Sequence, residues 1–245
     1  MNNCIKKMED HVSVRDFKNI PLSPEIRTTL ITAARSASSS HFVQAFSILE
    51  ITDKVLREKL SEITESSSYV KNTGTFFVFV ADLYRQSNLL IENNKSLDGL
   101  TNMESLIVSI VDTSIAAQNM AIAAESMDLG ICYIGGIRND VRKVSQLLKL
   151  PKYTLPLFGL TVGFPSSKNQ VKPRLLEKNQ ISENYYPKEQ FVDLSDYEKI
   201  SRKYYSSREN NQKQTSWLDS NIDYFETIRR PEIAEFLKEQ GFQLN

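Results

Sequence analysis

Residues 103–127 read MESLIVSIVDTSIAAQNMAIAAESM, the longest periodic stretch of the 245-residue chain. Its apolar side chains occupy most of the circumference of a helix, which predicts a helix buried on more than one side. Asp112, Gln118, Asn119 and Glu125 interrupt the stretch, so we do not expect it to span a membrane. It is predicted to be a central helix or one that lies in a dimer interface.

Four β-prone runs and several amphipathic segments surround this helix. The runs are 45–51, 76–81, 131–134 and 155–163, and the run at 76–81 (FFVFVA) is predicted to be buried on both faces. C-terminal helices are expected at 195–206, 214–228 and 231–240. The alternation predicts one α+β or α/β layered domain, with residues 1–165 as its core and 166–245 as a helical extension wrapped on that core.

Residue types at the helix ends predict several boundaries. Ser23 is an N-cap for a helix over 24–36, and Asn139 is the expected cap of the helix that ends near Leu148. Pro231 suits a first helical position, and Gly241 suits the residue after a helix end.

Composition excludes several classes of function. Lys+Arg and Asp+Glu are 30 each, so no global charge attracts nucleic acid or an anionic membrane. Two cysteines and two histidines are too few for a disulfide scaffold, a zinc site or a His-rich metal centre, and we expect no metal. The N-terminus lacks the pattern of a signal peptide, so the chain is expected in the reducing cytoplasm. No GxGxxG or GxxxxGK[ST] phosphate loop occurs.

Three polar segments have the residue types that bind a phosphate. His11–Arg15 joins a histidine, a hydroxyl and a guanidinium; 38–41 clusters hydroxyls before His41; and 172–174 places two cations around a proline. Each segment taken alone also reads as a solvated turn. No nucleophile–base pair is recognisable, so no catalytic side chain is assigned.

Seven motifs in a fixed order are more specific than any one of these segments. They are HxSxR from residue 11, SxSSSxFxQ at 36–44, DLYR at 82–85, VDTSIAAQNMAIAAES at 111–126, GxCYIGGIRN at 130–139, LPLFGLTVGFP at 155–165 and KPRL at 172–175. Together they resemble the flavin-dependent nitroreductase family, most closely its NADPH-dependent, oxygen-insensitive branch. The resemblance implies an α+β, nitroreductase-like fold with a central mixed sheet, an intertwined homodimer, and FMN held without a covalent bond at the interface.

The resemblance also implies which residues hold the cofactor. His11, Ser13, Lys172 and Arg174 would face the FMN phosphate. Arg15 would lie near the N1–O2 edge of the ring, where a cation stabilises the charge that reduction adds. The remaining cofactor contacts would come from Ser39, Tyr69, Tyr133, Ile134, Gly135 and Gly136. Tyr69 could equally be a core residue, and Gly135 with Gly136 could form only a strand-to-helix turn.

A second group of residues would face the substrates. The expected contacts to the electron acceptor or to NADPH are Ser40, His41, Phe42, Arg208, Lys213 and Arg230, with Arg208 and Lys213 assigned to the 2′-phosphate of NADPH. The chain departs from the family pattern at four positions, which are Val12, His41, Ser67 and Leu176. These departures bear on FMN affinity and substrate preference.

The implied reaction is a ping-pong hydride transfer from NADPH, or NADH, through flavin N5 to an acceptor. Nitroaromatics, quinones, azo compounds and free flavin are the expected small-molecule acceptors. Because FMN carries the chemistry, few catalytic side chains are needed. Two alternatives remain open: a dedicated reductase that supplies reduced FMN, and a flavin-binding sensor or store with little turnover.

Overall fold

The computed structural model describes residues 2–208 and 212–244. The chain forms two compact units. The first contains the residues up to Asn169 together with those from Arg230 onward, and the second is Gln170–Arg229. The sequence expectation divided the chain at residue 165; in the structure, residues after 229 belong to the first unit.

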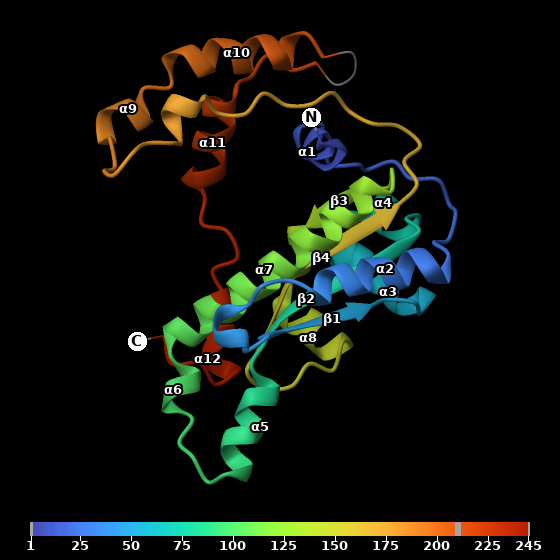
Figure 1. Cartoon of the computed structure of the whole chain (residues 1–245), viewed down its shortest axis with the longest axis vertical. Helices are drawn as coiled ribbons and strands as arrows, with labels where there is room; N and C mark the ends of the chain where they lie inside the picture. Colours follow the sequence, from blue (N-terminus) through green and yellow to red (C-terminus); the bar gives the residue numbers. More distant parts are fainter. Residues whose placement is uncertain (1, 209–211, 245) are drawn as a thin grey trace. The chain divides into compact units, whose positions relative to one another are not determined.

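A four-stranded sheet forms the centre of the first unit (Figure 1). Its strands are β1 (Phe46–Glu50), β2 (Thr75–Asp82), β3 (Gly130–Ile134) and β4 (Thr154–Gly163). They are ordered β1-β2-β4-β3, and each neighbouring pair is antiparallel. A parallel bridge between Ser13 and Ile131 lies at the free edge of β3, so the sheet together with this bridge contains both antiparallel and parallel pairing. Every residue of β2 is buried, which confirms the prediction for 76–81.

A proline lies in β4, which has a neighbour on both sides. Pro156 has no N–H to donate to β2, and prolines are normally confined to strand edges or bulges. The pairing of β2 with β4 shifts register between Phe79 and Val80, so that Phe79 pairs with Phe158 and Val80 pairs with Pro156. This irregularity accommodates the proline.

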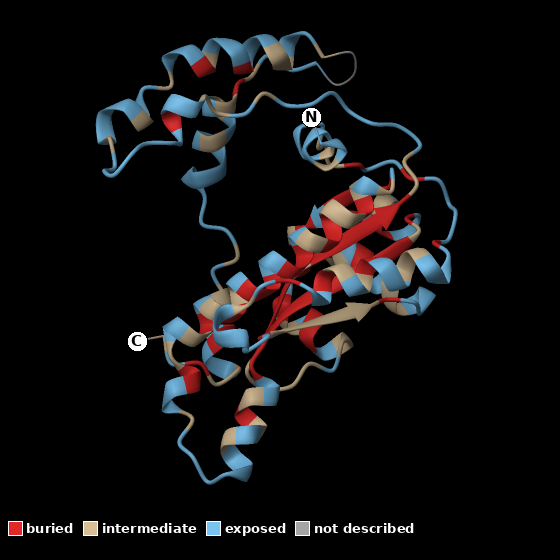
Figure 2. Ribbon diagram, in the orientation of Figure 1, coloured by how far each residue is buried: buried red, intermediate tan, exposed pale blue. Residues whose placement is uncertain are grey.

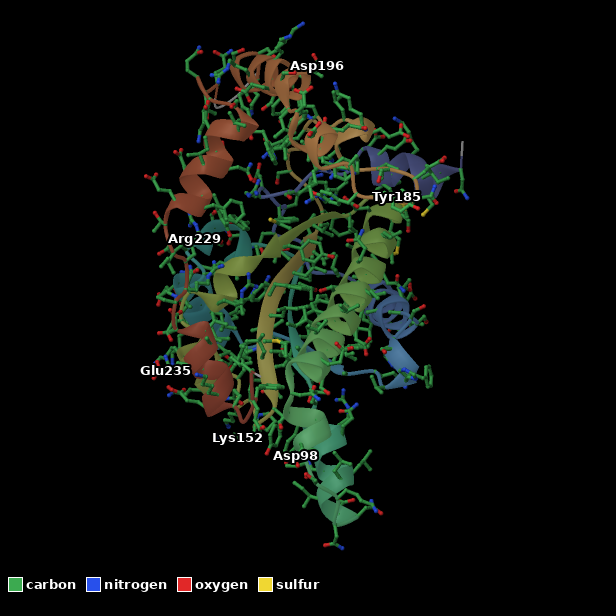
Figure 3. The ribbon with its side chains drawn as sticks, turned by 90° about the vertical axis from the view of Figure 1, so that its left-hand side faces the viewer. Asp98, Lys152, Tyr185, Asp196, Arg229 and Glu235 are labelled. Carbon is green, nitrogen blue, oxygen red and sulfur yellow. The ribbon has the colours of Figure 1, made fainter. Side chains whose placement is uncertain are left out.

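Helices cover both faces of the sheet. On one face lie α7 (Met103–Ser126) and α2 (Pro24–Arg35), whose Met120 and Leu30 join Phe77 and Leu160 in a buried cluster. On the other face, α3 (Lys54–Ile63), α4 (Ser67–Lys71) and α8 (Val141–Leu147) pack against Phe76 and Val78. Figure 2 shows β2 and β4 buried and β1 of intermediate burial, and Figure 3 shows side chains filling the space beside α7.

The remaining elements are helices and single helical turns of the two units. In the first unit they are α1 (Asn3–Glu9), η1 (Ser40–Phe42), α5 (Tyr84–Glu92), α6 (Asp98–Thr101), η2 (Gly135–Arg138) and α12 (Ile233–Glu239). In the second unit they are η3 (Glu177–Asn179), α9 (Lys188–Val192), α10 (Ser195–Ser206) and α11 (Trp217–Glu226).

Helix α7 is long and apolar enough to cross a membrane by length and composition alone. In this fold it packs against α2 and the sheet and carries a fully buried aspartate, Asp112. It is therefore a core helix of the first unit.

Several predicted helix boundaries differ from the structure, and α11 spans Trp217–Glu226 rather than 214–228. Asp140, rather than Asn139, caps α8 by accepting the Lys143 N–H at 2.9 Å. Helix α12 begins at Ile233 and not at Pro231, because a turn at residues 231–232 precedes it. Gly241 follows the end of α12 with φ of +100°, as the sequence predicts.

Candidate functional site

The segment His11–Arg15 lies along the free edge of β3. The Val14 N–H donates to the Ile131 carbonyl at 2.8 Å, and Val14 itself is buried. A Cβ on Gly130 would lie only 2.6 Å from Val14, so the glycine permits this close approach. Because side chains alternate along an extended segment, the side chains of Ser13 and Arg15 point to the face opposite that of the buried Val14.

Two polar contacts fix this segment. His11 Nδ1 lies 2.7 Å from Oε1 of Glu125 near the C-terminal end of α7. Ser13 forms a side-chain hydrogen bond with the thiol of Cys132 on β3, and the Arg15 charge acts on the same thiol. Burial raises the pKa of Cys132, and the Arg15 charge and the Ser13 hydrogen bond only partly oppose that effect. The structure thus brings His11, Ser13 and Arg15 together at one edge of the sheet.

The same edge continues into the segment Tyr133–Gly136. Tyr133 donates from its hydroxyl to Gln118 Oε1 of α7 at 3.2 Å, and its ring packs edge-on against Phe158 with centroids 5.3 Å apart. Burial, with a smaller effect of the Glu125 charge, raises the pKa of Tyr133, although 36% of the residue remains exposed. Ile134 is buried in the core.

The two glycines of this segment differ in their surroundings. A Cβ on Gly136 would lie 2.3 Å from the Thr64 carbonyl oxygen, so packing against the end of α3 requires glycine there. A Cβ on Gly135 would meet nothing nearer than Arg138 Nη2 at 3.6 Å. No packing within the described chain explains Gly135, whereas a flat ligand passing along the backbone would.

Tyr69 and Arg230 are tied to the surroundings of η2. The Tyr69 hydroxyl donates to Ser66 Oγ at 2.8 Å, and Ser66 follows the Thr64 that packs on Gly136. Arg230 donates from Nε and Nη2 to Asn139 Oδ1 at 3.1 and 2.8 Å, immediately after η2. The side chain of Ser67, one of the four departures, lies outside the described part of the chain.

The loop that contains Ser39, Ser40, His41 and Phe42 has an unusual backbone. His41, Phe42 and Gln44 have φ values of 46°, 57° and 51°, a region that costs a non-glycine residue about 1 kcal/mol or more. Phe42 is 78% exposed, and Ser39 Oγ accepts the Gln44 N–H at 3.3 Å. The buried carboxylate of Asp112 accepts the N–H groups of Ser40 and Ala45, both at 3.0 Å.

This loop and the His11 segment contact α7 at separate places. The loop is attached at Asp112 and the segment at Glu125, which are 13 positions apart on the helix. Thirteen helical residues rise about 20 Å. Within one chain, therefore, the structure does not bring Ser39–Phe42 together with His11–Arg15.

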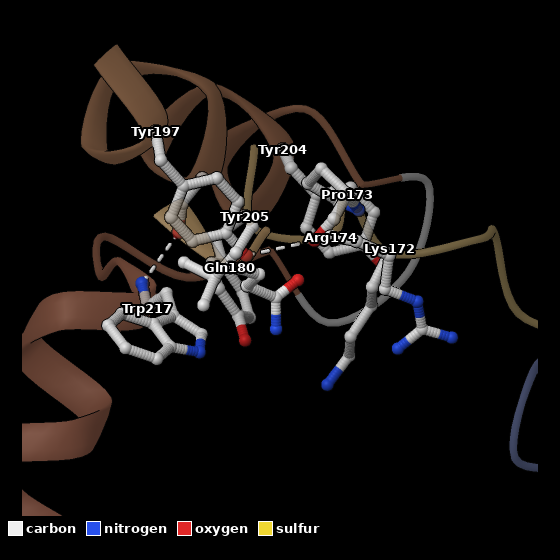
Figure 4. Close-up of a pocket in the computed structure, with 10 residues that line it drawn as sticks. Lys172, Pro173, Arg174, Gln180, Tyr197, Tyr204, Tyr205 and Trp217 are labelled. Carbon is white, nitrogen blue, oxygen red and sulfur yellow. Dashed lines mark hydrogen bonds between the residues drawn. The ribbon is translucent and has the colours of Figure 1, made fainter. Parts of the chain in front are cut away.

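The second unit contains a pocket of about 340 Å³ (Figure 4). Its lining residues are Lys172, Pro173, Arg174, Leu175, Gln180, Tyr197, Ser201, Tyr204, Tyr205 and Trp217. The Tyr197 hydroxyl donates to the Pro173 carbonyl at 2.9 Å, which holds the Lys-Pro-Arg segment against α10. The Tyr197 and Trp217 rings pack edge-on at 5.8 Å, and Lys172 Nζ lies 5.9 Å from the Tyr205 ring centre.

The two other predicted cations of this unit lie around the C-terminal end of α10. The Arg208 guanidinium lies 5.9 Å from the ring centre of Tyr204, and the Lys213 N–H donates to the Tyr205 carbonyl at 3.0 Å. Tyr204 and Tyr205 line the pocket, so the Arg208 guanidinium and the backbone of Lys213 lie next to its wall.

Sequence reasoning missed the residues that orient these groups. In the sequence, Glu125 and Asp112 appear only as polar interruptions of an apolar helix. Arg85, which donates to the Gln44 and Phe46 carbonyls of the loop, appears only as part of a motif. A buried carboxylate needs hydrogen-bond donors, so polar residues inside an otherwise apolar helix were the available signal. The donors come from distant loops, which a sequence pattern does not reveal.

Comparisons with known proteins give a consistent result. The model of the nitroreductase family matches residues 8–164, and that of the family's C-terminal domain matches residues 172–245. The chain is 41% identical to an FMN reductase (NADPH) of Bacillus subtilis, covering all of both chains. It is 38% identical to an oxygen-insensitive NADPH nitroreductase of Salmonella typhimurium, covering 99% of both.

Solved structures agree in fold. A nitroreductase from Bacillus subtilis superimposes with a TM-score of 0.92 at 39% identity, covering 98% of both chains. An NADPH:FMN oxidoreductase from Vibrio harveyi, complexed with NAD⁺, gives a TM-score of 0.88 at 34% identity, covering 98% of this chain and 99% of that one.

Proposed function

The chain belongs to the nitroreductase family, and on this basis we propose that it is an NAD(P)H-dependent flavin oxidoreductase with FMN as its cofactor. The observation that carries the proposal is the match of both family models along the chain, together with full-length relatives named FMN reductase (NADPH) and NADPH nitroreductase. When bound, FMN supplies the ability to accept and donate a hydride.

The residues present fit FMN. His11, Ser13 and Arg15 provide a donor-rich edge beside β3, and Lys172 and Arg174 provide two cations in the second unit. These are the groups that a dianionic phosphate and an electron-accepting ring need. The open space at Gly135 is the second supporting feature, because a side chain there would occupy the path of a planar ring.

The chain's own residues would bind and orient the reactants. Arg15 would place a fixed positive charge near the ring, and Tyr133, Ile134, Gly135 and Gly136 would line one edge of it. The loop Ser39–Phe42 would add a cofactor contact through Ser39 and border the acceptor through Ser40, His41 and Phe42. Arg230, held by Asn139 near η2, would contribute to the same substrate side.

Homodimer formation is part of this proposal, and the surface of α7 supports it. Met103, Ile107, Val111 and Ile115 repeat every fourth residue and are 37–47% exposed. An exposed apolar stripe of this kind is typical of a protein–protein interface. A shared site would also join the His11 segment of one subunit to the Ser39–Phe42 loop of its partner, groups that are separate within one chain.

The first experiment is an absorbance spectrum of the purified protein, before and after anaerobic NADPH. We expect visible flavin absorbance that bleaches when NADPH is added. A colourless protein that takes up no added FMN, or a bound flavin that stays oxidised, would overturn the proposal. The acceptor is then assigned by comparing turnover of a nitrofuran, a quinone and free FMN, because relatives of both the nitroreductase and FMN reductase types are similar to the chain.

NADPH is proposed as the preferred donor because Arg208 and Lys213 lie at the end of α10 and can bind a 2′-phosphate. Arg208→Ala is expected to raise KM for NADPH about tenfold, because it removes one charge-assisted hydrogen bond to the 2′-phosphate. NADH lacks this phosphate, so its KM should stay nearly unchanged. Equal effects on both donors would contradict the assignment. A cytoplasmic location accords with Cys4 and Cys132, both free thiols.

A further inference from the structure

The loop 39–46 is held by side chains from two other elements. Asp112 of α7 is fully buried and accepts the N–H groups of Ser40 and Ala45, at 3.0 Å each. Both carboxylate oxygens are therefore used by the loop, one near each of its ends. An aspartate buried in an apolar helix is costly to desolvate, so its two backbone contacts provide the compensation.

Arg85 holds the same loop from α5. Its Nη2 donates to the carbonyl oxygens of Gln44 and Phe46, at 3.2 and 2.5 Å. Its Nη1 donates to Asp82 Oδ2 at 3.2 Å and to Ser47 Oγ at 2.9 Å, which fixes the guanidinium plane. Gln86, the next residue along α5, donates to the Val43 carbonyl at 2.7 Å.

Backbone N–H groups of the loop are thus bonded by Asp112, and backbone carbonyls by Arg85 and Gln86. These contacts hold a backbone with three left-handed, non-glycine residues, which an unrestrained loop would not retain. We call Asp112, Arg85 and Gln86, with their bonds to the loop, the frame. Within the frame, Phe42 is 78% exposed and His41 is also exposed, so neither side chain contributes to the core. The frame therefore fixes the backbone that carries two exposed rings.

We propose that Asp112 and Arg85 are positioning residues that hold His41 and Phe42 in place for the electron acceptor, so that they determine acceptor specificity without touching the acceptor. The assignment rests on the proposed function, since it takes the acceptor to bind beside this loop. A flat aromatic acceptor is the chemical class that an exposed phenylalanine ring on a fixed backbone favours. Preorganisation of such a ring lowers the entropy lost when the acceptor binds.

Two variants test the frame from its two sides. Asp112→Asn keeps the shape but presents an amide N–H₂ to one of the two loop N–H groups, which removes an acceptor there. Arg85→Lys keeps the positive charge but loses the forked donor geometry. Because the Arg85 side chain is 52% exposed, this second variant keeps the test available if a change at the buried Asp112 prevents folding.

Hydrogen exchange of the purified protein is the first readout and does not depend on activity. We expect the amides of Ser40 and Ala45 to be protected in the wild-type protein and to exchange about tenfold faster or more in Asp112→Asn. Arg85→Lys is expected to increase exchange in peptides that cover residues 42–46. Unchanged protection in both variants would overturn the proposal, whether or not the protein binds flavin.

The second readout separates the two half-reactions of the flavin-loaded protein. With nitrofurazone as acceptor and the variants saturated with FMN, kcat/KM is expected to fall about tenfold in both variants, mainly through KM, while the rate of flavin reduction by NADPH stays within about twofold. An equal loss in both half-reactions would show a general structural effect and overturn the assignment. If wild-type protein lacks flavin, the proposed function fails while the exchange result still decides whether the frame exists.

Thr113→Val is the matched control. Thr113 is the fully buried neighbour of Asp112 on α7, and its hydroxyl donates to the Ser109 carbonyl at 2.6 Å instead of bonding the loop. We expect this variant to keep wild-type exchange at Ser40 and Ala45 and wild-type acceptor kinetics. If it reproduces the effects of Asp112→Asn, those effects arise from α7 in general and the proposal is wrong.

Discussion

His11 Nδ1 lies 2.7 Å from Oε1 of Glu125, so a residue of the N-terminal segment is oriented by the last turns of the central helix α7. Residues 11 and 125 are far apart in the sequence, and only the fold makes this contact. It fixes the ring nitrogen that faces α7 and leaves the other nitrogen for a different partner.

Glu125→Ala is expected to weaken FMN retention through His11. Without Glu125 the His11 ring loses its orientation, and the charge-assisted hydrogen bond that it would give to the phosphate contributes about 1.5–3 kcal/mol, so the dissociation constant of FMN should rise about tenfold or more. Glu125→Gln, which keeps an oxygen acceptor, should lose much less. Equilibrium titration of the apoprotein with FMN measures both, and equal behaviour of the two variants would show that the contact does not orient His11 for binding.

Gly135→Ala and Gly136→Ala form a matched pair with opposite expectations. A Cβ on Gly136 would overlap the Thr64 carbonyl, so this variant should lose about 1–3 kcal/mol of unfolding free energy. A Cβ on Gly135 meets nothing within 3.4 Å, so that variant should fold normally and lose affinity for FMN. Thermal melting of the apoproteins and FMN titration separate the two effects. Wild-type FMN affinity in Gly135→Ala would argue against a ring beside this residue.

Val111→Lys is expected to break the proposed dimer. The substitution places an ammonium group in the exposed apolar stripe of α7, and burying an unpaired charge in an interface costs several kcal/mol. Val55→Lys on α3 is the control, because Val55 is a helical valine of the same unit, 62% exposed and outside the stripe. Light scattering after size-exclusion chromatography should show a dimer for wild type and Val55→Lys. A Val111→Lys protein that remains dimeric would place the interface elsewhere.

Lys172→Ala and Arg174→Ala should each raise the FMN dissociation constant, and the double variant should purify largely without flavin. Each removes a cation that the phosphate would require, a loss of about 1.5–3 kcal/mol. Lys188→Ala, on α9 of the same unit, removes one exposed charge and should keep wild-type flavin content. Undiminished flavin in the double variant would refute the phosphate assignment.

Because the Cys132 thiol is buried, we expect the free energy of unfolding to fall at alkaline pH. Burial raises the pKa of this thiol above its ordinary value of 9.0, so the folded protein keeps the thiol neutral while the unfolded chain ionises it. The contribution of the neutral Cys132 thiol to the free energy of unfolding is fully present below about pH 8.5. It declines as the pH rises toward the pKa of the thiol in the folded protein. Urea unfolding of wild type and Cys132→Ala across this range should show the steeper decline in wild type. Parallel curves would contradict the assignment.

Sequence by itself determined the elements whose cause is local or periodic. The continuous apolar run at 76–81 could be satisfied only by a strand covered on both faces, and Ser23 with Pro24 marked the start of α2. The ordered motifs also identified the family, because their order and residue types are visible in one dimension.

Tertiary structure decided the contacts that need residues distant in sequence. In the sequence, Asp112 is only a polar residue within an apolar helix. The fold places the amides of Ser40 and Ala45 against its carboxylate. Gly135 and Gly136 are adjacent and identical in sequence, yet only the position of Thr64 distinguishes a glycine required by packing from one that leaves open space. Hydrophobic periodicity specifies which face of an element is buried, whereas hydrogen bonds and close packing depend on three-dimensional neighbours, which a local pattern does not encode.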